Sequence, residues 1–151
     1  MSVTIRQFQP IDQEEARRIV LEGLGEHFGV IDESLNPDLD DIQESFIVAG
    51  DEFYVAQCDG HIVGTVGLLF EEGRARIVRM SVAKHYRHRG IARSLLERCI
   101  KRAKQHGSAQ IVAFTEPHWS DAVGFYTTSG FQQYCRDEVD IHLRVSLNGT
   151  G

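Results

Sequence analysis

The stretch YRHRGIARSLLERCI, residues 86–100, decides the fold of this chain. It gathers histidine and arginine around Gly90 and then repeats apolar residues at helical spacing, namely Ile91, Leu95, Leu96, Cys99 and Ile100. This spacing predicts an amphipathic helix from about Gly90 to about Gln105. The preceding segment, GRARIVRMSVA at residues 73–83, predicts a strand with Ile77, Met80 and Val82 in the core. A strand, a cationic loop and a helix start therefore follow one another.

This order is a common phosphate-binding arrangement, because the first amides of a helix lack partners and the helix dipole is positive there. The loop is KHYRHRG, residues 84–90. Gly90 lets the backbone approach an anion closely, and the small Ala92 leaves the same face open. Charge-assisted donors come from Arg87, His88, Arg89 and Arg93. The alternative is a helix that starts at a glycine and carries exposed arginines.

The residues before this region show strand and helix patterns in turn. We predict a strand at 3–8, a helix at 12–25, a short helix at 37–48, and strands at 52–58 and 61–70. Asp12 and Glu15 have the spacing of a capping box at the first helix. Asp59-Gly60 separates the last two strands and predicts a hairpin with a type I′ turn.

The residues after it continue the alternation. We predict a strand at 109–115, a helix at 120–130, and two closing strands at 131–135 and 139–145. The run AQIVAFT is typical of a parallel strand covered on both faces. In the last strand we expect Val139, Ile141, Leu143 and Val145 to point inward. The resulting order β-α-α-β-β-β-α-β-α-β-β predicts an α/β domain with a mixed sheet.

Length and composition favour one ordinary globular domain. The 151 residues lead us to expect a domain at 1–146 and a polar tail at 147–151. Hydrophobic residues make up 42% of the chain, and no apolar run reaches the roughly 20 residues that cross a bilayer. The amino terminus shows no apolar export segment. We therefore expect a cytoplasmic protein without a membrane partner.

Cysteine and histidine spacing indicates no metal. Cys58, Cys99 and Cys135 form no C-x-x-C pair, and the seven histidines show no ligand spacing. The net charge of −6 argues against nucleic acid as a partner, because phosphate binding needs a basic face. The charge is also segregated, since residues 19–73 contain no Lys or Arg whereas 74–104 are rich in both. This favours two ligands of opposite charge, the alternative being two solvated faces.

Two motifs resemble one protein family. Arg87-x-x-Gly90-x-Ala92 matches the R/Q-x-x-G-x-G/A signature of the GNAT superfamily of N-acetyltransferases, on a loop that follows a strand as in that family. A second match is AVGFYTTSGF, residues 122–131, which is similar to the family's A-x-x-F-Y-x-x-x-G-F motif. The resemblance implies a single-domain GNAT fold, with a mixed, mostly antiparallel sheet of six to seven strands. It also implies a splay between strands 4 and 5 and about four flanking helices.

The resemblance implies acetyl-CoA as cosubstrate and no metal. The amides around His88 to Arg93 would hold the pyrophosphate, and the strand backbone at 80–82 would pair with the pantetheine arm. The residues it assigns to the cofactor are Met80, Ser81, Val82, Arg87, His88, Arg89, Gly90, Ile91, Ala92, Arg93, Trp119 and Tyr126. Trp119 stands where many members have an asparagine, and it packs on the cofactor, walls the acceptor pocket or fills the core.

For catalysis the resemblance assigns Tyr126 as general acid, the alternative being a core tyrosine. The oxyanion donor would be the backbone amide of Met80 or Val82. The base is open, because Arg76 stands where the histone-modifying branch has a glutamate. The candidate bases are Glu116, Glu72 and, third, Glu26, each of them otherwise a surface carboxylate or an acceptor contact.

The acceptor in this family enters over the first two helices, which are acidic here. We therefore predict acetyl transfer to the primary amine of a cationic small molecule, such as a polyamine, a basic amino acid or an aminoglycoside-like amine, or to a lysine side chain. The predicted acceptor contacts are Glu26, Phe28 and Asp32. Such a protein would act as a monomer or a homodimer. One alternative is a non-catalytic protein of the same fold that senses acyl-CoA. Another is a toxin-like enzyme that acetylates charged transfer RNA, against which the negative net charge weighs.

Overall fold

In a computed structural model of the chain, the structure describes residues 2–29 and 36–147. The elements are β1 (Val3–Gln7), η1 (Pro10–Asp12), α1 (Gln13–Phe28), η3 (Pro37–Leu39), η4 (Gln43–Val48), β2 (Glu52–Cys58), β3 (His61–Glu71), β4 (Arg74–Val82), η5 (Lys84–Tyr86), α2 (Ile91–His106), β5 (Gln110–Thr115), α3 (Ser120–Thr128), β6 (Gln132–Arg136) and β7 (Ile141–Ser146). Of these, η4 is a π-helix and the other η segments are 3₁₀ turns.

The strands form one seven-stranded sheet in the order β1-β2-β3-β4-β5-β7-β6. Neighbouring strands are antiparallel except β4 and β5, which run parallel. Within the described residues, α1, η4, α2 and α3 flank this sheet. The predicted α/β fold class, with a mixed and mostly antiparallel sheet, is therefore confirmed.

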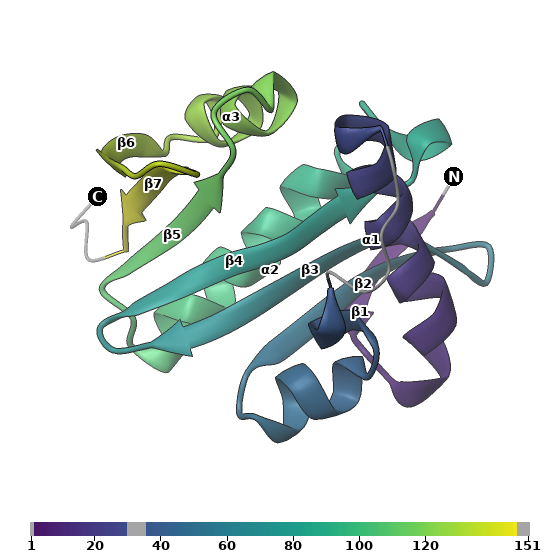
Figure 1. Ribbon diagram of the computed structural model, residues 1–151. Helices are drawn as coiled ribbons and strands as arrows, with labels where there is room; N and C mark the ends of the chain where they lie inside the picture. Colours follow the sequence, from purple (N-terminus) through teal and green to yellow (C-terminus); the bar gives the residue numbers. More distant parts are fainter. Residues whose placement is uncertain (1, 30–35, 148–151) are drawn as a thin grey trace.

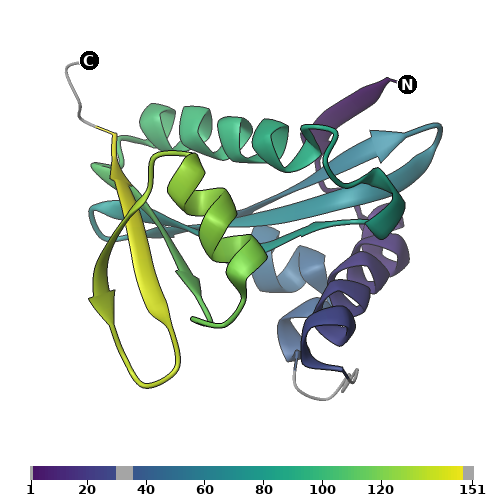
Figure 2. The ribbon, with the colours of Figure 1, turned by 90° about the horizontal axis from the view of Figure 1, so that it is seen from above.

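Helices cover both faces of the sheet (Figures 1 and 2). On one face, α2 buries Ile91, Leu95 and Cys99 in a cluster that also holds Tyr126 and Phe131. On the other face, α1 and η4 pack in a second cluster against side chains of β2 and β3. The predicted amphipathic spacing of α2 explains its place, because all its apolar positions fall on one side.

The junction between β4 and β5 shapes the site. The two strands pair only over residues 74–77 and 110–113, after which they separate. Beyond that point β4 contains a bulge, where the register against β3 shifts and Arg79 adopts a φ of 54°. Bulges re-aim the strand that carries them and often lie beside functional sites. The predicted splay between strands 4 and 5 is therefore present.

Helix α1 differs from the prediction at both ends. It continues past Gly25 to Phe28 and ends at Gly29, whose φ of 83° is the left-handed conformation that stops a helix. At its start, Asp12 and Glu15 form no capping box. The Asp12 carboxylate instead accepts hydrogen bonds from the Arg6 guanidinium and the Gln9 amide, and Glu15 accepts one from the amide of Ile62.

Other local predictions have mixed outcomes. The hairpin at Asp59-Gly60 is confirmed, with φ values of 52° and 80°. The helix predicted at 37–48 is a 3₁₀ turn followed by a π-helix.

One core prediction was wrong, since Val139, expected in the core, precedes β7 and is 67% exposed. The prediction for Met80 and Val82 holds in part. Both side chains pack against the core cluster but are only half-buried, because the splay leaves that part of β4 facing a cavity.

Candidate active site

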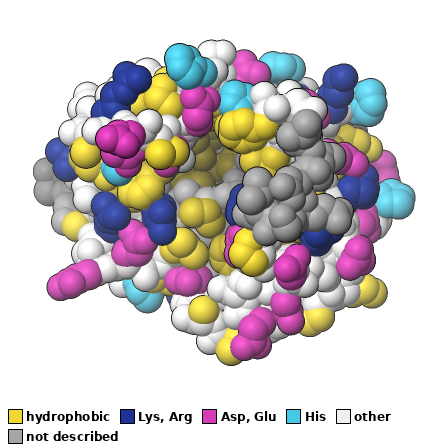
Figure 3. Space-filling model, viewed as in Figure 1, with side chains coloured by type: hydrophobic (Ala, Val, Ile, Leu, Met, Phe, Trp, Pro, Cys, Tyr) yellow, Lys and Arg dark blue, Asp and Glu magenta, His cyan; other side chains and the backbone are white. Residues whose placement is uncertain are grey.

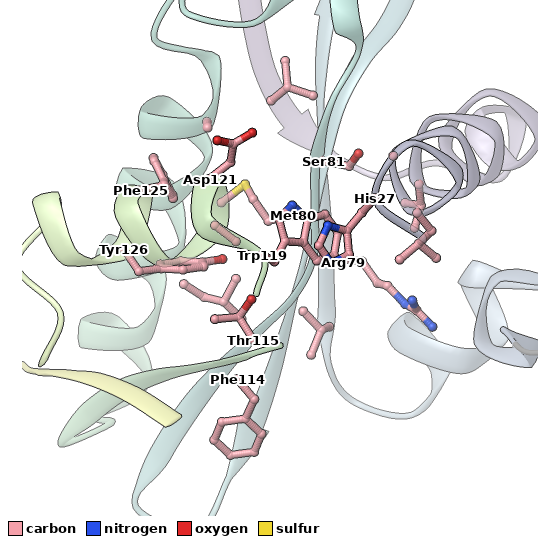
Figure 4. Close-up of a pocket in the computed structure, with 18 of the residues that line it drawn as sticks. His27, Arg79, Met80, Ser81, Phe114, Thr115, Trp119, Asp121, Phe125 and Tyr126 are labelled. Carbon is pink, nitrogen blue, oxygen red and sulfur yellow. The ribbon is translucent and has the colours of Figure 1, made fainter. Parts of the chain in front are cut away.

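A cavity of about 1570 Å³ opens where β4 and β5 separate. Figure 3 shows it as a hollow with hydrophobic side chains on its floor, and Figure 4 shows side chains from α1, β4, β5 and α3 around it. Small-molecule pockets usually measure roughly 300 to 1,000 Å³. This cavity is therefore large enough for two reactants to meet.

One end of the cavity is the loop before α2. Gly90 caps that helix with a φ of 83°, and an added Cβ there would meet no atom within 4 Å. His88 also has a positive φ, 62°, which is uncommon for a residue with a side chain. The open space at Gly90 lies beside the first, unpartnered amides of a 16-residue helix. This end has the shape and polarity that a pyrophosphate needs.

Most of the residues that the resemblance assigns to the cofactor line this cavity together. They are Met80, Ser81, Val82, Arg87, His88, Gly90, Ile91, Ala92, Arg93, Trp119 and Tyr126. Arg89, also assigned, instead holds its guanidinium carbon 5.6 Å from the ring centroid of Tyr86. The Ser81 hydroxyl donates to the carbonyl of Ile19 at 3.2 Å, so this side chain faces α1.

Arg87 joins the loop to α1. Its two Nη atoms bind the Glu26 carboxylate at 2.7 and 3.1 Å, and its Nε donates to the carbonyl of Val82 at 3.0 Å. The hydrogen bond from Arg87 outweighs the partial burial of Glu26 and lowers the pKa of that carboxyl. Glu26, predicted as an acceptor contact, is therefore already neutralised by a cation of the chain.

Tyr126 lies on the opposite wall. Its side chain is 6% exposed, and its hydroxyl points from α3 into the cavity toward Thr115 and Trp119 (Figure 4). Burial raises the pKa of the phenol, and the proximity of Cys99 adds to the shift. The Tyr126 ring therefore packs on Phe131 in the core, while the hydroxyl of the same side chain faces the cavity.

A cluster of side chains that the sequence did not predict bridges the two sides of the cavity. His27, near the end of α1, stacks on Trp119 with ring centroids 4.1 Å apart and an interplanar angle of 8°. Its Nε2 lies 3.1 Å from Oε2 of Glu116, which follows β5. Gly29 together with His27 in the preceding turn was the sequence signal for a longer α1, since basic residues favour the last turn and glycine the position after it.

The two glutamates predicted as bases have different surroundings. Burial would raise the pKa of Glu116, but hydrogen bonds from the His118 amide and from His27 outweigh it, so the pKa lies below its usual value. Glu72 is exposed in the turn between β3 and β4 and does not line the cavity. The structure therefore does not bring Glu72 to the site.

The predicted acceptor contacts are also separated. Phe28 is 56% exposed, with its ring centroid 6.0 Å from that of Trp119, at the outer edge of the cluster. Asp32 lies outside the described residues. Of the other acidic groups that line the cavity, Asp38 binds Arg79 at 2.6 Å, whereas no ion pair within the described part of the chain involves Asp51, Asp121 or Asp140.

Arg76 occupies the position where the histone-modifying branch has its glutamate. Its Nη2 lies 3.0 Å from Glu71, and its guanidinium carbon lies 5.0 Å from the ring centroid of Phe114. Its Nε is buried and has no hydrogen-bond partner among the described residues. The side chain at position 76 is therefore a cation bound to a carboxylate and not a proton acceptor.

Among residues 2–29 and 36–147, no helix has the length and apolar character needed to cross a bilayer. No group of three or more histidine, cysteine, aspartate and glutamate side chains there is arranged to hold a metal ion.

The topology and cavity define an α/β class in which a parallel strand pair opens onto a binding site. Residues 15–131 match the model of the acetyltransferase (GNAT) family. The chain is 31% identical over 110 residues to N-acetyltransferase 8B of Homo sapiens, covering 68% of this chain and 48% of that protein. It is 33% identical over 118 residues to N-acetyltransferase 8 of Rattus norvegicus, covering 74% and 53%. The chain therefore belongs to the acetyltransferase (GNAT) family.

Solved structures agree on the fold. An acetyltransferase of the GNAT family from Staphylococcus aureus Mu50 matches with a TM-score of 0.89 and 25% identity, covering 97% of this chain and 100% of that chain. The PaiA N-acetyltransferase from Thermoplasma acidophilum, solved in complex with coenzyme A, matches with a TM-score of 0.87 and 21% identity, covering 97% and 99%. The chain spans about half the length of the curated relatives it matches.

Proposed function

We propose that this chain is an acetyl-CoA-dependent N-acetyltransferase that acts on a primary amine. The proposal rests on one observation: the left-handed loop at Gly90 and the inward-pointing hydroxyl of Tyr126 border the same cavity. The loop offers helix amides to a pyrophosphate, and the unpaired edge of β4 offers backbone groups to an extended arm. Family membership and the coenzyme A complex of PaiA support the same assignment.

The reaction would use the thioester as the activated acyl group. The amine nitrogen forms a bond to the carbonyl carbon, the carbon–sulfur bond breaks, and the amine loses a proton. Tyr126 would give its proton to the departing thiolate, a contribution worth roughly 10²- to 10⁴-fold in rate. An amide on β4, at Met80 or Val82, would stabilise the oxyanion.

We propose a cationic amine as the acceptor, on different residues from those first expected. Glu26 and Asp38 are paired with arginine. Three carboxylates line the cavity without an ion pair in the described part of the chain and would attract a second ammonium group, namely Asp51, Asp121 and Asp140. Polyamines, basic amino acids and lysine side chains belong to this class.

The test is thiol release from acetyl-CoA with a panel of cationic, neutral and anionic amines. We expect turnover with a subset of primary amines and faster turnover with cationic ones than with anionic ones of the same size. Gly90→Glu should abolish acetyl-CoA binding, because it places a strained side chain and a negative charge in the loop. Binding of acetyl-CoA without thiol release from any amine would overturn the catalytic proposal in favour of a non-catalytic acyl-CoA sensor.

A further inference from the structure

The cluster of His27, Glu116 and Trp119 is not used by the function proposed above. It joins the last turn of α1 to the segment between β5 and α3 (Figure 4). The side chains of His27 and Glu116 are 19% and 27% exposed. A histidine that bonds a carboxylate and stacks on a tryptophan is held in one orientation.

We propose that His27 is the general base of the acetyl transfer and that Glu116 is its positioning residue. This inference rests on the proposed function, for which it names the missing proton acceptor. His27 lines the cavity and Glu116 does not, so the imidazole rather than the carboxylate meets the acceptor amine. The other predicted base, Glu72, lies in an exposed turn.

The hydrogen bond assigns the two ring nitrogens. An ionised Glu116 accepts a hydrogen bond from the Nε2–H of His27, at 3.1 Å, and in this tautomer the lone pair is on Nδ1. Glu116 stays ionised because the amide of His118 also donates to it, at 3.1 Å. The described residues provide no hydrogen bond to Nδ1, so that atom is available to a substrate.

The proton balance is simple. Nδ1 of His27 takes a proton from the ammonium form of the acceptor, and Glu116 stabilises the imidazolium. The neutral amine then forms the carbon–nitrogen bond, Tyr126 gives its proton to the thiolate as the carbon–sulfur bond breaks, and the proton that the acylated nitrogen loses returns to Tyr126 through solvent. Solvent removes the proton from His27, so the net products are an acetylated amine, a free thiol and one proton.

The experiment compares His27→Gln with wild type in steady-state kinetics, using the best primary amine of the panel. Glutamine keeps a polar group near Glu116 but takes up no proton. We expect kcat to fall about 100-fold at pH 7, with an unchanged Kd for acetyl-CoA. His61→Gln is the matched control, because His61 also pairs with a glutamate, Glu15 at 3.6 Å, but is 77% exposed and does not line this cavity.

Two further measurements separate a base from a residue that only shapes the pocket. A fluorinated analogue of the acceptor has a weakly basic amine that is already neutral at pH 7, and its turnover should fall far less in His27→Gln. The rate of the variant should also keep rising with pH, whereas the wild-type rate levels off. The neighbouring titratable and charged groups, namely Glu116, His118, Glu26 and Arg87, are unchanged in the variant.

The outcomes distinguish the two proposals. If the wild type is active and His27→Gln has the same kcat and pH profile, His27 is not the general base. The proposed acetyltransferase function then still stands. A raised KM with unchanged kcat likewise overturns the base, since His27 would then only contact the acceptor. Wild type that releases no thiol with any amine overturns both proposals together.

Discussion

At the scale of single residues, burial decides the chemistry of Tyr126. Its ring lies 5.1 Å from that of Phe125 and 5.2 Å from that of Phe131, measured between centroids. Removal from water penalises the phenolate, so the raised pKa keeps the phenol protonated through neutral and mildly alkaline pH. Because the folded-state pKa exceeds that of an unfolded chain, this group weakens folding only as the pH rises above 10.

Tyr126→Phe should therefore lower kcat about 100-fold and leave the Kd for acetyl-CoA within a factor of two. The phenylalanine keeps the ring contacts, and the lost hydroxyl has no hydrogen bond within the described residues, so the free energy of unfolding should change little. Steady-state kinetics and urea unfolding measure the two effects. Tyr134→Phe is the control, because that hydroxyl lies on β6 near Arg74, outside the cavity. Equal losses of kcat in both variants would remove Tyr126 from the mechanism.

Site residues fall into two groups by how far the sequence could predict them. Gly90 and Ala92 were predictable because the loop conformation depends on neighbours in the chain, and glycine tolerates the observed φ of 83°. The pair of His27 and Glu116 was not, since 89 positions separate the two residues. Only the tertiary fold brings them together. In addition, the predicted first helix ended at Gly25 and so did not include His27.

At the scale of elements, the placement of α1 sets the geometry of the site, because this helix carries His27. The Arg6–Asp12 pair fixes its first turn to β1, with 2.7 Å between Nη1 and Oδ2. Gly23 allows its middle to approach β4 closely, since an added Cβ would lie 2.8 Å from the Ser81 hydroxyl. Both contacts are long-range and leave no periodic signal in the sequence.

Asp12→Ala should lower the free energy of unfolding at pH 7 by about 2 to 3 kcal/mol, because it leaves a partly buried guanidinium without its partner. The control is Glu22→Ala, which removes an exposed ion pair with Arg18 and should cost about 0.5 kcal/mol or less. Urea unfolding of both variants measures the difference. If Asp12→Ala lowers the free energy of unfolding no more than Glu22→Ala does, the Arg6–Asp12 pair does not fix α1 to β1.

The same pair has a defined pH dependence. Burial alone would raise the pKa of Asp12, but hydrogen bonds from Arg6 and from the Gln9 amide outweigh it, and the pKa lies below 3.8. A depressed folded-state pKa gives stability that is present above pH 3.8 and is lost as the pH falls through the folded value. The difference in free energy of unfolding between wild type and Asp12→Ala should therefore be smaller near pH 3 than at pH 7, as measured by urea unfolding.

Two elements have conformations that pattern reading does not detect. The π-helix Gln43–Val48 has hydrogen bonds that span five residues instead of four, so its apolar residues fit the α-helical period only roughly. The bulge at Arg79 places a non-glycine residue at a φ of 54°, stabilised by the bond from the Thr65 hydroxyl to the Arg79 carbonyl at 2.8 Å. Helix α2 and the β2–β3 hairpin were predictable because periodicity and turn residues agree there.

At the scale of the whole molecule, ion pairs formed by the fold cancel part of the charge segregation of the sequence. Arginines from the basic segment 74–104 pair with carboxylates from the cation-free segment 19–73. The pairs are Arg79 with Asp38 at 2.6 Å, Arg87 with Glu26 at 2.7 Å, Arg102 with Glu52 at 2.8 Å, and Arg74 and Arg76 with Glu71 at 2.8 and 3.0 Å. The two segments therefore serve partly as each other's counter-ions, and a ligand that needs one of these arginines must displace a carboxylate.

Glu26→Gln tests this competition. Coenzyme A phosphates and Glu26 would share the Arg87 guanidinium, so removing the carboxylate charge should tighten acetyl-CoA binding. The pair is partly exposed, at 35% for Arg87 and 40% for Glu26, and such pairs are worth up to about 1 kcal/mol. The Kd measured by calorimetry should therefore fall about two- to five-fold at low salt.

Glu22→Gln is the matched control for this variant. It removes the same charge one helical turn earlier, from a residue that pairs with Arg18 rather than Arg87. A general change in net charge would tighten binding equally in both variants, whereas displacement at Arg87 tightens it only in Glu26→Gln. The difference in Kd between Glu26→Gln and Glu22→Gln should shrink at about 0.5 M salt, where charges are screened within a few ångströms. Equal Kd values for the two variants at low salt would mean that Arg87 keeps Glu26 when the cofactor binds, and that the pyrophosphate is held by the loop amides alone.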